Sequence, residues 1–136
     1  MFFPDKDGRF KINDVTDIVA ARAAARELAG QAGFGMADRA RLATAVSELT
    51  RNVLQYAGGG TCEINNLSDD AHMKIVAIVE DHGSGIADID KAMQDGFTTS
   101  GGLGAGLPGT KRLMDEFSIE SRPGLTRVTI TIFRHK

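Results

Sequence analysis

Apolar residues recur every three to four positions in two stretches of the N-terminal half of the chain, which is the spacing of one face of a helix. The first predicted helix follows Asn13 or Asp14, either of which can cap it, and ends before Gly33. The second ends at the glycines of residues 58–60, and its beginning is less clear because Met36 stands where a polar cap is expected. The two stripes are Ile18, Ala21, Ala25, Leu28 and Ala32, and then Leu42, Val46, Leu49, Val53 and Tyr56.

Further segments show the spacing of β-strands. Residues 73–80 are apolar on both faces at their centre, which indicates a strand interior to a sheet. Residues 127–134 alternate between two unlike faces, and Ser68-Asp-Asp70 is typical of a turn. The predicted strands are residues 8–12, at a sheet edge, 61–67, 73–80 and 127–134, and two further helices are predicted over residues 88–94 and 108–117.

These elements predict the α+β class, as a two-layer α/β sandwich in which helices pack on one face of a mixed β-sheet. The length of 136 residues suits one compact domain with a buried core, and it is too short for an added sensor or dimerisation domain. We therefore expect a single domain over residues 1–136, without repeats or interdomain linkers.

Composition and charge exclude several classes of function. The net charge is -2, the pI is near 5.9 and the basic residues are scattered, so nothing indicates a nucleic-acid surface. No apolar run approaches the roughly 20 residues of a membrane helix, and the first residues do not resemble a signal peptide, so we expect a cytoplasmic protein. Cys62 is the only cysteine and is expected to be a structural strand residue, and no Cys/His spacing suggests zinc.

The second predicted helix carries a candidate catalytic pair in the stretch Glu48-Leu-Thr-Arg-Asn52. Residues four apart share a helix face, so Glu48 and Asn52 project together at the rim of the buried stripe. A carboxylate there can take a proton from an attacking hydroxyl, and an amide oxygen can bind Mg²⁺ or phosphate oxygens. The alternative is an ordinary solvated helix face.

The stretch Asp81-His-Gly-Ser-Gly85 follows the interior strand. An acid at that position can accept a hydrogen bond from the amino group of adenine, where guanine would offer a carbonyl, and Gly83 and Gly85 allow the backbone to approach the ring. A plain Asp-x-Gly turn is the alternative. His82 has no partner histidine nearby in sequence and is expected to face solvent.

The stretch Gly101-Gly-Leu-Gly-Ala-Gly-Leu107 leads into a predicted helix. The glycine backbone and the N-terminus of that helix both offer N–H groups that suit phosphate oxygens. The stretch is neither a Walker loop nor a Rossmann fingerprint, and a plain flexible loop is the alternative. Phe97, Thr98 and Thr99 precede it and could close over a nucleotide as a lid.

Taken together, these motifs resemble those of the GHKL, or Bergerat-fold, ATPase and kinase superfamily over roughly residues 14–133. Within this range, residues 95–117 are similar to the small switch kinases of bacterial stress signalling, the RsbT type. The stretches Ile18-Val-Ala-Ala-Arg22 and Ala43-Thr-Ala-Val-Ser-Glu-Leu49 point to the same family.

The resemblance implies roles for individual residues. Glu48 would be the catalytic base, Asn52 the Mg²⁺ ligand and Asp81 the adenine contact, with Gly83 and Gly85 beneath the ring. The threonine that this family places beside the aspartate would be Thr126, with Thr129 as the other possible register. The remaining nucleotide-binding residues would be Gly102, Leu103, Gly104, Ala105, Gly106 and Leu107, of which the three glycines would line the phosphates.

The resemblance also implies the reaction and its partners. Such kinases use ATP and Mg²⁺ to phosphorylate a serine or threonine on STAS-domain proteins, and the released kinase activates a PP2C-type phosphatase. Related anti-sigma kinases carry an arginine before the glycine loop, whereas residues 96–106 contain no basic residue, so Mg²⁺, Arg51, Lys111 or Arg112 must supply that charge. Sensor histidine kinases place a phosphoacceptor helix domain ahead of this one, and that arrangement is not expected here.

Three functions follow, in order of preference: a protein serine/threonine kinase, an anti-sigma factor that holds a sigma subunit, and a nucleotide-gated adaptor without transfer. A docking surface for partners is harder to place. The helix over residues 14–32 is one option, because Arg22, Arg26 and Glu27 lie off its apolar stripe, although such residues usually form a solvated face.

Overall fold

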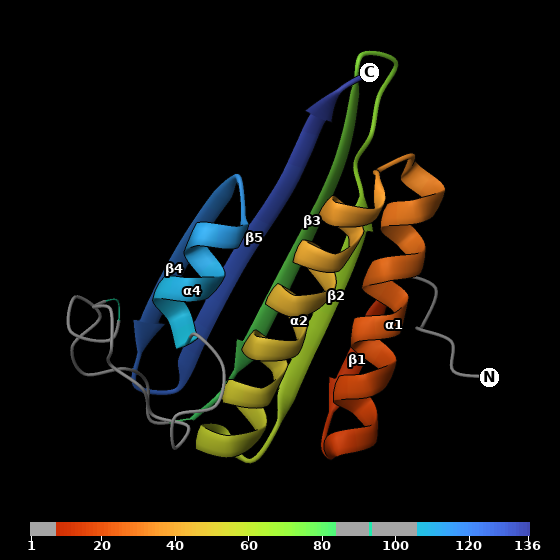
Figure 1. Cartoon of the computed structure of the whole chain (residues 1–136). Helices are drawn as coiled ribbons and strands as arrows, with labels where there is room; N and C mark the ends of the chain where they lie inside the picture. Colours follow the sequence, from red (N-terminus) through yellow and green to blue (C-terminus); the bar gives the residue numbers. More distant parts are fainter. Residues whose placement is uncertain (1–7, 84–92, 94–105) are drawn as a thin grey trace.

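In the computed structural model, which describes residues 8–83, 93 and 106–136, five strands form one sheet with helices on one of its faces (Figure 1). The predicted α+β class and two-layer arrangement are confirmed. The strands are β1 (Arg9–Ile12), β2 (Gly60–Asn66), β3 (His72–Asp81), β4 (Glu116–Arg122) and β5 (Leu125–His135), and the described helices are α1 (Val15–Ala32), α2 (Met36–Ala57) and α4 (Gly106–Leu113).

The order of strands in the sheet is β1-β2-β3-β5-β4, and each described pair of neighbours is antiparallel. The expected mixed sheet is therefore corrected to an antiparallel one for the described strands. The reason is visible in Figure 1, where each labelled element runs opposite to the one before it, so strands that become neighbours point in opposite directions. β3 has partners on both sides, as its apolar centre predicts.

Helix α1 begins and ends where its sequence predicts. The side chain of Asp14 accepts hydrogen bonds from the backbone N–H groups of Thr16 and Asp17, and the Asp17 carboxylate accepts one from the N–H of Asp14. This reciprocal arrangement is a capping box, which satisfies amide groups that have no partner within the helix. At the other end Gly33 has a φ of 102°, a left-handed conformation that glycine adopts without a Cβ clash.

Helix α2 packs its stripe against the sheet, with one exception. Leu42, Val46, Leu49 and Val53 are buried, whereas Tyr56 is 49% exposed, so its predicted place in the core is wrong. Tyr56 lies in the last turn, and Figure 1 shows that this turn extends past the end of β3. The helix begins without a side-chain cap after Gly35, in agreement with the absence of a polar residue there.

The helix α4 and the segment that follows it differ from the expected ones. The helix predicted over residues 108–117 begins earlier, at Gly106, and ends at Leu113, after which Glu116–Arg122 forms β4 at the sheet edge. The change of direction is fixed by Asp115, whose N–H donates to the Thr131 carbonyl and whose carboxylate accepts from the Phe133 N–H. Residues 116–122 alternate polar and half-buried side chains, which is the period of a strand. The helix predicted over residues 88–94 lies outside the described residues except for residue 93.

The core lies between the helices and the sheet face that they cover. Ala21 and Ala25 let α1 approach closely, and the sheet contributes one alternate set of positions from each central strand. Cys62 on β2 is fully buried, and burial, followed by the charge of Glu63, raises the pKa of its thiol to about 12. The largest fully buried side chains are Phe34, Ile12, Leu42, Leu49, Ile75, Ile130 and Ile132.

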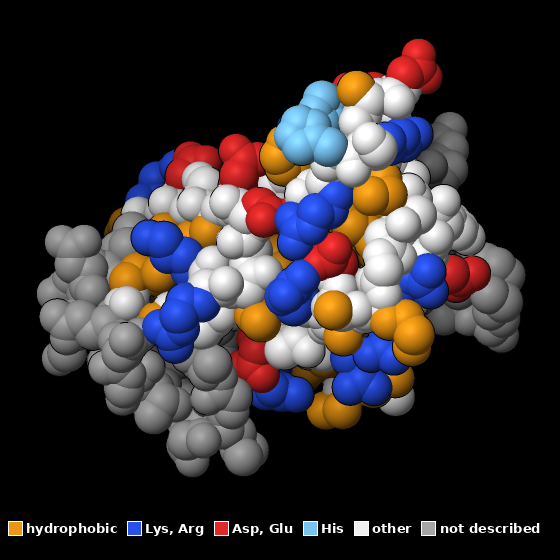
Figure 2. All heavy atoms as spheres, turned by 45° about the horizontal axis from the view of Figure 1, so that its top comes forward, with side chains coloured by type: hydrophobic (Ala, Val, Ile, Leu, Met, Phe, Trp, Pro, Cys, Tyr) orange, Lys and Arg blue, Asp and Glu red, His pale blue; other side chains and the backbone are white. Residues whose placement is uncertain are grey.

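The end of the sheet where β3 begins and β5 finishes is covered by aromatic rings. The ring centroids of His72 and His135 are 4.8 Å apart, and Phe133 stacks on His72 at 5.3 Å. Figure 2 shows histidine side chains gathered at this end of the molecule. Asp81, the last residue of β3, therefore lies at the opposite end of the sheet.

A matched pair of valines tests how much the helix–sheet interface stabilises the fold. Val46→Ala removes two buried methyl groups and should lower the free energy of unfolding by about 2 kcal/mol. Val19→Ala makes the same change on α1 where the side chain is 53% exposed, and should change stability by less than about 0.5 kcal/mol. Urea unfolding followed by circular dichroism measures both. Equal losses would contradict the assigned core.

The beginning of α2 is tied to the sheet by charge. Arg134 on β5 donates hydrogen bonds to Asp38 at 2.9 Å and to Asp115 at 2.8 Å, and Arg41 also pairs with Asp38. Burial alone would raise the pKa of Asp38, but the Arg41 hydrogen bond and the charge of Arg134 together hold that pKa below its usual value. The ionised form of Asp38 therefore stabilises the folded state.

This ion pair gives stability a specific dependence on pH. A carboxyl whose pKa is depressed in the folded state stabilises above its unfolded pKa of 3.8, and loses that contribution as the pH falls through the folded value. Asp38→Asn should therefore cost about 1 kcal/mol near pH 7, and the cost should shrink as the pH falls below 3.8 toward the lower folded-state pKa. Unfolding curves across pH test this, with Asp70→Asn on the exposed turn as control. A cost that stays constant with pH would disprove it.

Candidate active site

The two candidate catalytic residues lie on one flank of α2. Ser47 and Leu54 line a groove against α1, and Glu48 and Asn52 follow more than a quarter-turn further round the helix. They therefore face away from α1, toward the side on which α4 packs against α2 (Figure 1). The Glu48 side chain is 12% exposed and Asn52 is half-buried, in agreement with the rim position that their spacing predicts.

Arg51 contacts Glu48 directly. Its guanidinium donates a hydrogen bond of 2.9 Å to the Glu48 carboxylate, while its own side chain is 42% exposed. This contact orients the candidate base. From the sequence, Arg51 was predicted only as a source of charge for phosphate, and its pairing with Glu48 was not predicted, although a separation of three residues on a helix indicates such a contact.

Asp81 lies at the end of β3 on the sheet face that the helices cover. It is 9% exposed, and its carboxylate accepts a hydrogen bond of 2.9 Å from the Gly83 N–H. A Cβ on Gly83 would lie 3.0 Å from the Ala57 Cβ and 3.2 Å from the same carboxylate. Glycine therefore allows the end of α2 and the turn after Asp81 to approach this closely.

The strand register shows where the two candidate threonines lie relative to Asp81. Thr126 on β5 is paired directly with Asp81, and it is 8% exposed, on the same face of the sheet. Its hydroxyl lies 2.7 Å from the hydroxyl of Ser121 on β4. Thr129 is paired with Ile78 three positions away, on the opposite face. Of the two registers considered, the described geometry brings Thr126 to Asp81.

The turn after β3 is joined to the turn between β4 and β5. The Gly124 N–H donates to the Gly83 carbonyl at 2.9 Å, and a ring nitrogen of His82 lies 3.1 Å from the Gly124 carbonyl. Gly124 has a φ of 92°, which few other residues would adopt. His82 is exposed, as expected for a turn residue, and these contacts hold the backbone beside Asp81.

Part of the predicted site lies outside the described residues. The glycine-rich stretch is described only for Gly106 and Leu107, which open α4, so the expectation that it leads into a helix agrees with these two residues. Lys111 and Arg112 are exposed in the last turn of α4, at the other end of that helix, whereas Arg51 lies beside Glu48. The residues outside the described ranges are Gly85, Gly102, Leu103, Gly104, Ala105 and the candidate lid of Phe97, Thr98 and Thr99.

The described residues offer no cluster of three or more His, Cys, Asp or Glu side chains that could hold a metal ion. Asn52 supplies one amide oxygen, and its side chain makes no hydrogen bond within the described ranges. A single hard oxygen fits Mg²⁺ that arrives with a nucleotide, because Mg²⁺ keeps several waters and takes its other ligands from phosphates. No described helix is long and apolar enough to cross a membrane.

Comparison with known proteins identifies the family. Residues 13–132 match the model of the histidine kinase-like ATPase domain. The chain belongs to this family. The predicted GHKL relationship and fold are thereby confirmed, and use of ATP follows from membership.

Individual relatives indicate which functional class within the family this chain resembles. The chain is 56% identical over 108 residues to the serine/threonine-protein kinase RsbT of Bacillus subtilis, covering 79% of this chain and 81% of that one. It is 34% identical over 123 residues to an anti-sigma F factor of Caldanaerobacter subterraneus, covering 85% and 86%. The similarity to RsbT confirms the predicted class, a protein serine/threonine kinase of the RsbT type.

A solved structure supports the fold alone. The crystal structure of the RsbU and RsbW domains of a Mycobacterium tuberculosis protein superposes with a TM-score of 0.64 at 20% identity. The alignment covers 93% of this chain, which spans 32% of that longer protein.

The assignment of Thr126 can be tested against Thr129. Thr126→Val keeps the shape of the side chain but removes a hydroxyl beside Asp81, and should weaken ATP binding about fivefold, the effect of one hydrogen bond. Thr129→Val makes the same change on the other sheet face and should leave the affinity unchanged. Isothermal titration calorimetry with ATP and Mg²⁺ measures both. A loss confined to Thr129→Val would reverse the assignment.

Proposed function

We propose that this chain transfers the γ-phosphoryl group of ATP to a serine or threonine hydroxyl on a STAS-domain protein in the cytoplasm. Once released from that protein, it binds and activates a PP2C-type phosphatase. The observation that carries the proposal is the 56% identity to a serine/threonine-protein kinase, combined with a carboxylate and an amide on the flank of α2 that faces α4. The chain as a whole, residues 1–136, would act as one catalytic domain.

Glu48 is the base in this proposal. Its carboxylate takes the proton from the substrate hydroxyl as the oxygen attacks the γ-phosphorus, and the bond to the bridging oxygen breaks to release ADP. The hydrogen bond from Arg51 holds one carboxylate oxygen, which leaves the other for the hydroxyl. The low exposure of Glu48 supports this role, because a water-poor environment strengthens electrostatic interactions with the transferring group.

Asp81 and Thr126 recognise adenine in this proposal. The buried carboxylate accepts a hydrogen bond from the exocyclic amino group of the base, and the threonine hydroxyl beside it completes the polar edge. Gly83 and Gly85 would lie beneath the ring, and Gly102, Leu103, Gly104, Ala105, Gly106 and Leu107 would line the phosphates. Asn52 would hold Mg²⁺, which supplies positive charge to the phosphates.

A second function has its own support. The 34% identity to an anti-sigma F factor favours an anti-sigma factor that sequesters a sigma subunit under the control of bound ATP. The higher identity to RsbT favours the kinase. A pull-down distinguishes the two, because the kinase should retain STAS proteins and a PP2C phosphatase, whereas the anti-sigma factor should retain a sigma subunit.

The roles of the two carboxylates can be separated by mutation. Glu48→Gln should keep ATP affinity within about twofold and lower phosphate transfer by at least about a hundredfold, because only the base is lost. Asp81→Asn should instead weaken ATP binding about tenfold, because the amide disrupts the acceptor for adenine. Transfer is measured with labelled ATP, Mg²⁺ and a panel of STAS domains, and affinity by calorimetry.

Glu27→Gln, on the exposed face of α1, is the matched control and should change neither quantity. Equal losses of ATP affinity in Glu48→Gln and Asp81→Asn would refute the separate roles. If no STAS domain of the panel becomes labelled on serine or threonine, the proposed substrate class is refuted.

A further inference from the structure

Two histidines lie opposite each other where β3 begins and β5 ends. His72 is paired directly with His135, and both side chains project from the sheet face that the helices leave uncovered. The Lys136 N–H donates to the Ala71 carbonyl at 2.8 Å, so the adjacent His72–His135 pair is a non-hydrogen-bonded one. Side chains approach most closely in such pairs. The strand register therefore brings together two imidazoles that are far apart along the chain.

The separation of the two rings matches that of two imidazoles bound to one metal ion. With a metal–nitrogen bond of about 2.1 Å, a ring centre about 1.2 Å behind its nitrogen and bond angles of about 90° to 109°, two such ring centroids lie about 4.7 to 5.4 Å apart. The observed centroid distance is 4.8 Å. The ring planes are inclined by 50°, which allows their in-plane lone pairs to converge, whereas parallel stacked rings would not.

Asp69 fixes the orientation and the tautomer of His72. Its carboxylate lies 3.2 Å from Nδ1 of His72 and accepts hydrogen bonds of 2.8 Å from the N–H groups of Ala71 and His72. The bond from Ala71, followed by that from His72, holds the pKa of Asp69 below its usual value, so the carboxylate is ionised. Nδ1 then carries the proton, and Nε2 keeps its lone pair for a metal. A carboxylate behind a histidine ligand is the usual outer partner in metal sites.

Packing holds the His72 ring while both histidines stay open to solvent. The Phe133 ring stacks on His72, with centroids 5.3 Å apart and planes inclined by 24°. The His72 side chain is 32% exposed, and His135 is exposed (Figure 2). Among the described residues His135 makes ring contacts only. An ion can thus reach both rings, one of which is already held in place before it binds.

We propose that His72 and His135 form a binding site for a divalent transition-metal ion, with water completing the coordination and Asp69 as the outer partner. Imidazole nitrogen suits Cu²⁺, Ni²⁺ and Zn²⁺, whereas Mg²⁺ prefers oxygen ligands. The site therefore differs in chemistry from Asn52, and it lies at the opposite end of β3 from Asp81. The bound ion joins β3 to β5 at the far end of the ladder. The proposal does not depend on the proposed function.

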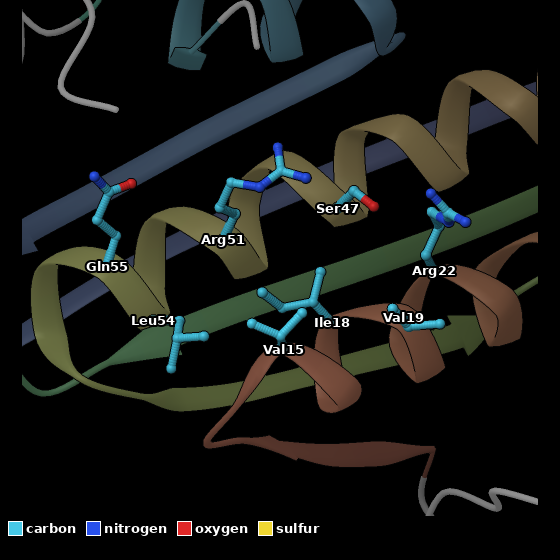
Figure 3. Close-up of a pocket in the computed structure, with 8 residues that line it drawn as sticks. All are labelled: Val15, Ile18, Val19, Arg22, Ser47, Arg51, Leu54 and Gln55. Atoms are coloured by element: carbon cyan, nitrogen blue, oxygen red, sulfur yellow. The ribbon is translucent and has the colours of Figure 1, made fainter. Parts of the chain in front are cut away.

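Other side chains in the described part of the chain suit such an ion less well. A ring nitrogen of His82 already lies 3.1 Å from the Gly124 carbonyl, and no second histidine is near it. Cys62 is buried, with a thiol pKa of about 12. The pocket between α1 and α2 (Figure 3) is lined by no histidine, cysteine or carboxylate, and its polar side chains are Arg22, Ser47, Arg51 and Gln55.

The experiment uses Cu²⁺ as the probe, because it binds imidazole more tightly than Ni²⁺ or Zn²⁺. Nucleotide-free protein is titrated with CuCl₂ in a buffer that does not bind copper, and calorimetry measures the affinity. One equivalent should bind per chain, and excess Mg²⁺ should not displace it. His72→Gln and His135→Gln should each weaken the affinity at least about a hundredfold, and Asp69→Asn about tenfold, because it removes only the outer partner.

His82→Gln is the matched control, because it removes the third histidine of the chain and leaves the pair intact. It should not change the affinity. Wild-type affinity in both His72→Gln and His135→Gln would overturn the proposal, and so would a loss confined to His82→Gln. A loss in only one of the two pair variants would mean a single-histidine site, which also contradicts the proposal.

A spectroscopic measurement tests the same site without relying on mutation. Electron paramagnetic resonance of wild-type protein with one equivalent of Cu²⁺ should show coupling to two imidazole nitrogens, and each pair variant should show at most one. Coupling to a single nitrogen in the wild type would refute a site shared by both rings. Circular dichroism of each variant shows that a lost affinity does not come from unfolding. Phosphate transfer is not measured, so failure of the proposed function would leave these results unchanged.

Discussion

The pairing of β3 with β5 is the interaction on which the rest of this structure depends. The two strands are hydrogen-bonded from His72 opposite His135 to Asp81 opposite Thr126. Because side chains alternate along a strand, this register decides at every position which residues face the helices. A shift of one residue would turn Thr126 to the uncovered face and bring Leu125 or Arg127, depending on its direction, beside Asp81. The ladder thus aligns the hydrophobic core and the candidate adenine site at once.

Helix α2 is the element that relates this sheet to the chemistry. The apolar stripe from Leu42 to Val53 packs one side of this helix against the sheet. One flank of the helix faces α1, and the other carries Glu48 and Asn52. Its end lies against Gly83, where an added Cβ would lie 3.0 Å from the Ala57 Cβ, a tight contact. The position of the candidate base relative to Asp81 is therefore set by packing along the whole helix, and not by any single contact between the two carboxylates.

The parts of the fold that the sequence predicted well are those with strong local signals. Asp14 and Gly33 delimit α1 because capping and left-handed backbone depend on few neighbours. β4 was missed because its first residues continue the apparent period of α4, and only pairing with β5 makes them a strand. Tyr56 matched the helical period, but periodicity does not reveal where the sheet beneath a helix ends.

The candidate site likewise divides into features that local sequence predicts and features that depend on distant parts of the chain. Glu48, Asn52 and Asp81 were identified from spacing and from the end of a strand, which are local features. The choice between Thr126 and Thr129 needed the strand register, which depends on residues about 45 positions apart along the chain. The pairing of Arg51 with Glu48 was accessible from spacing and was overlooked.

Burial of Cys62 also decides how this protein responds to oxidants. At physiological pH a thiol with a pKa near 12 is almost wholly protonated, and here it is also shielded from solvent. Peroxide or disulfide stress should therefore leave the thiol of the folded protein unmodified. The same inertness means that a cysteine introduced at the surface would be the sole reactive handle for a fluorophore or spin label.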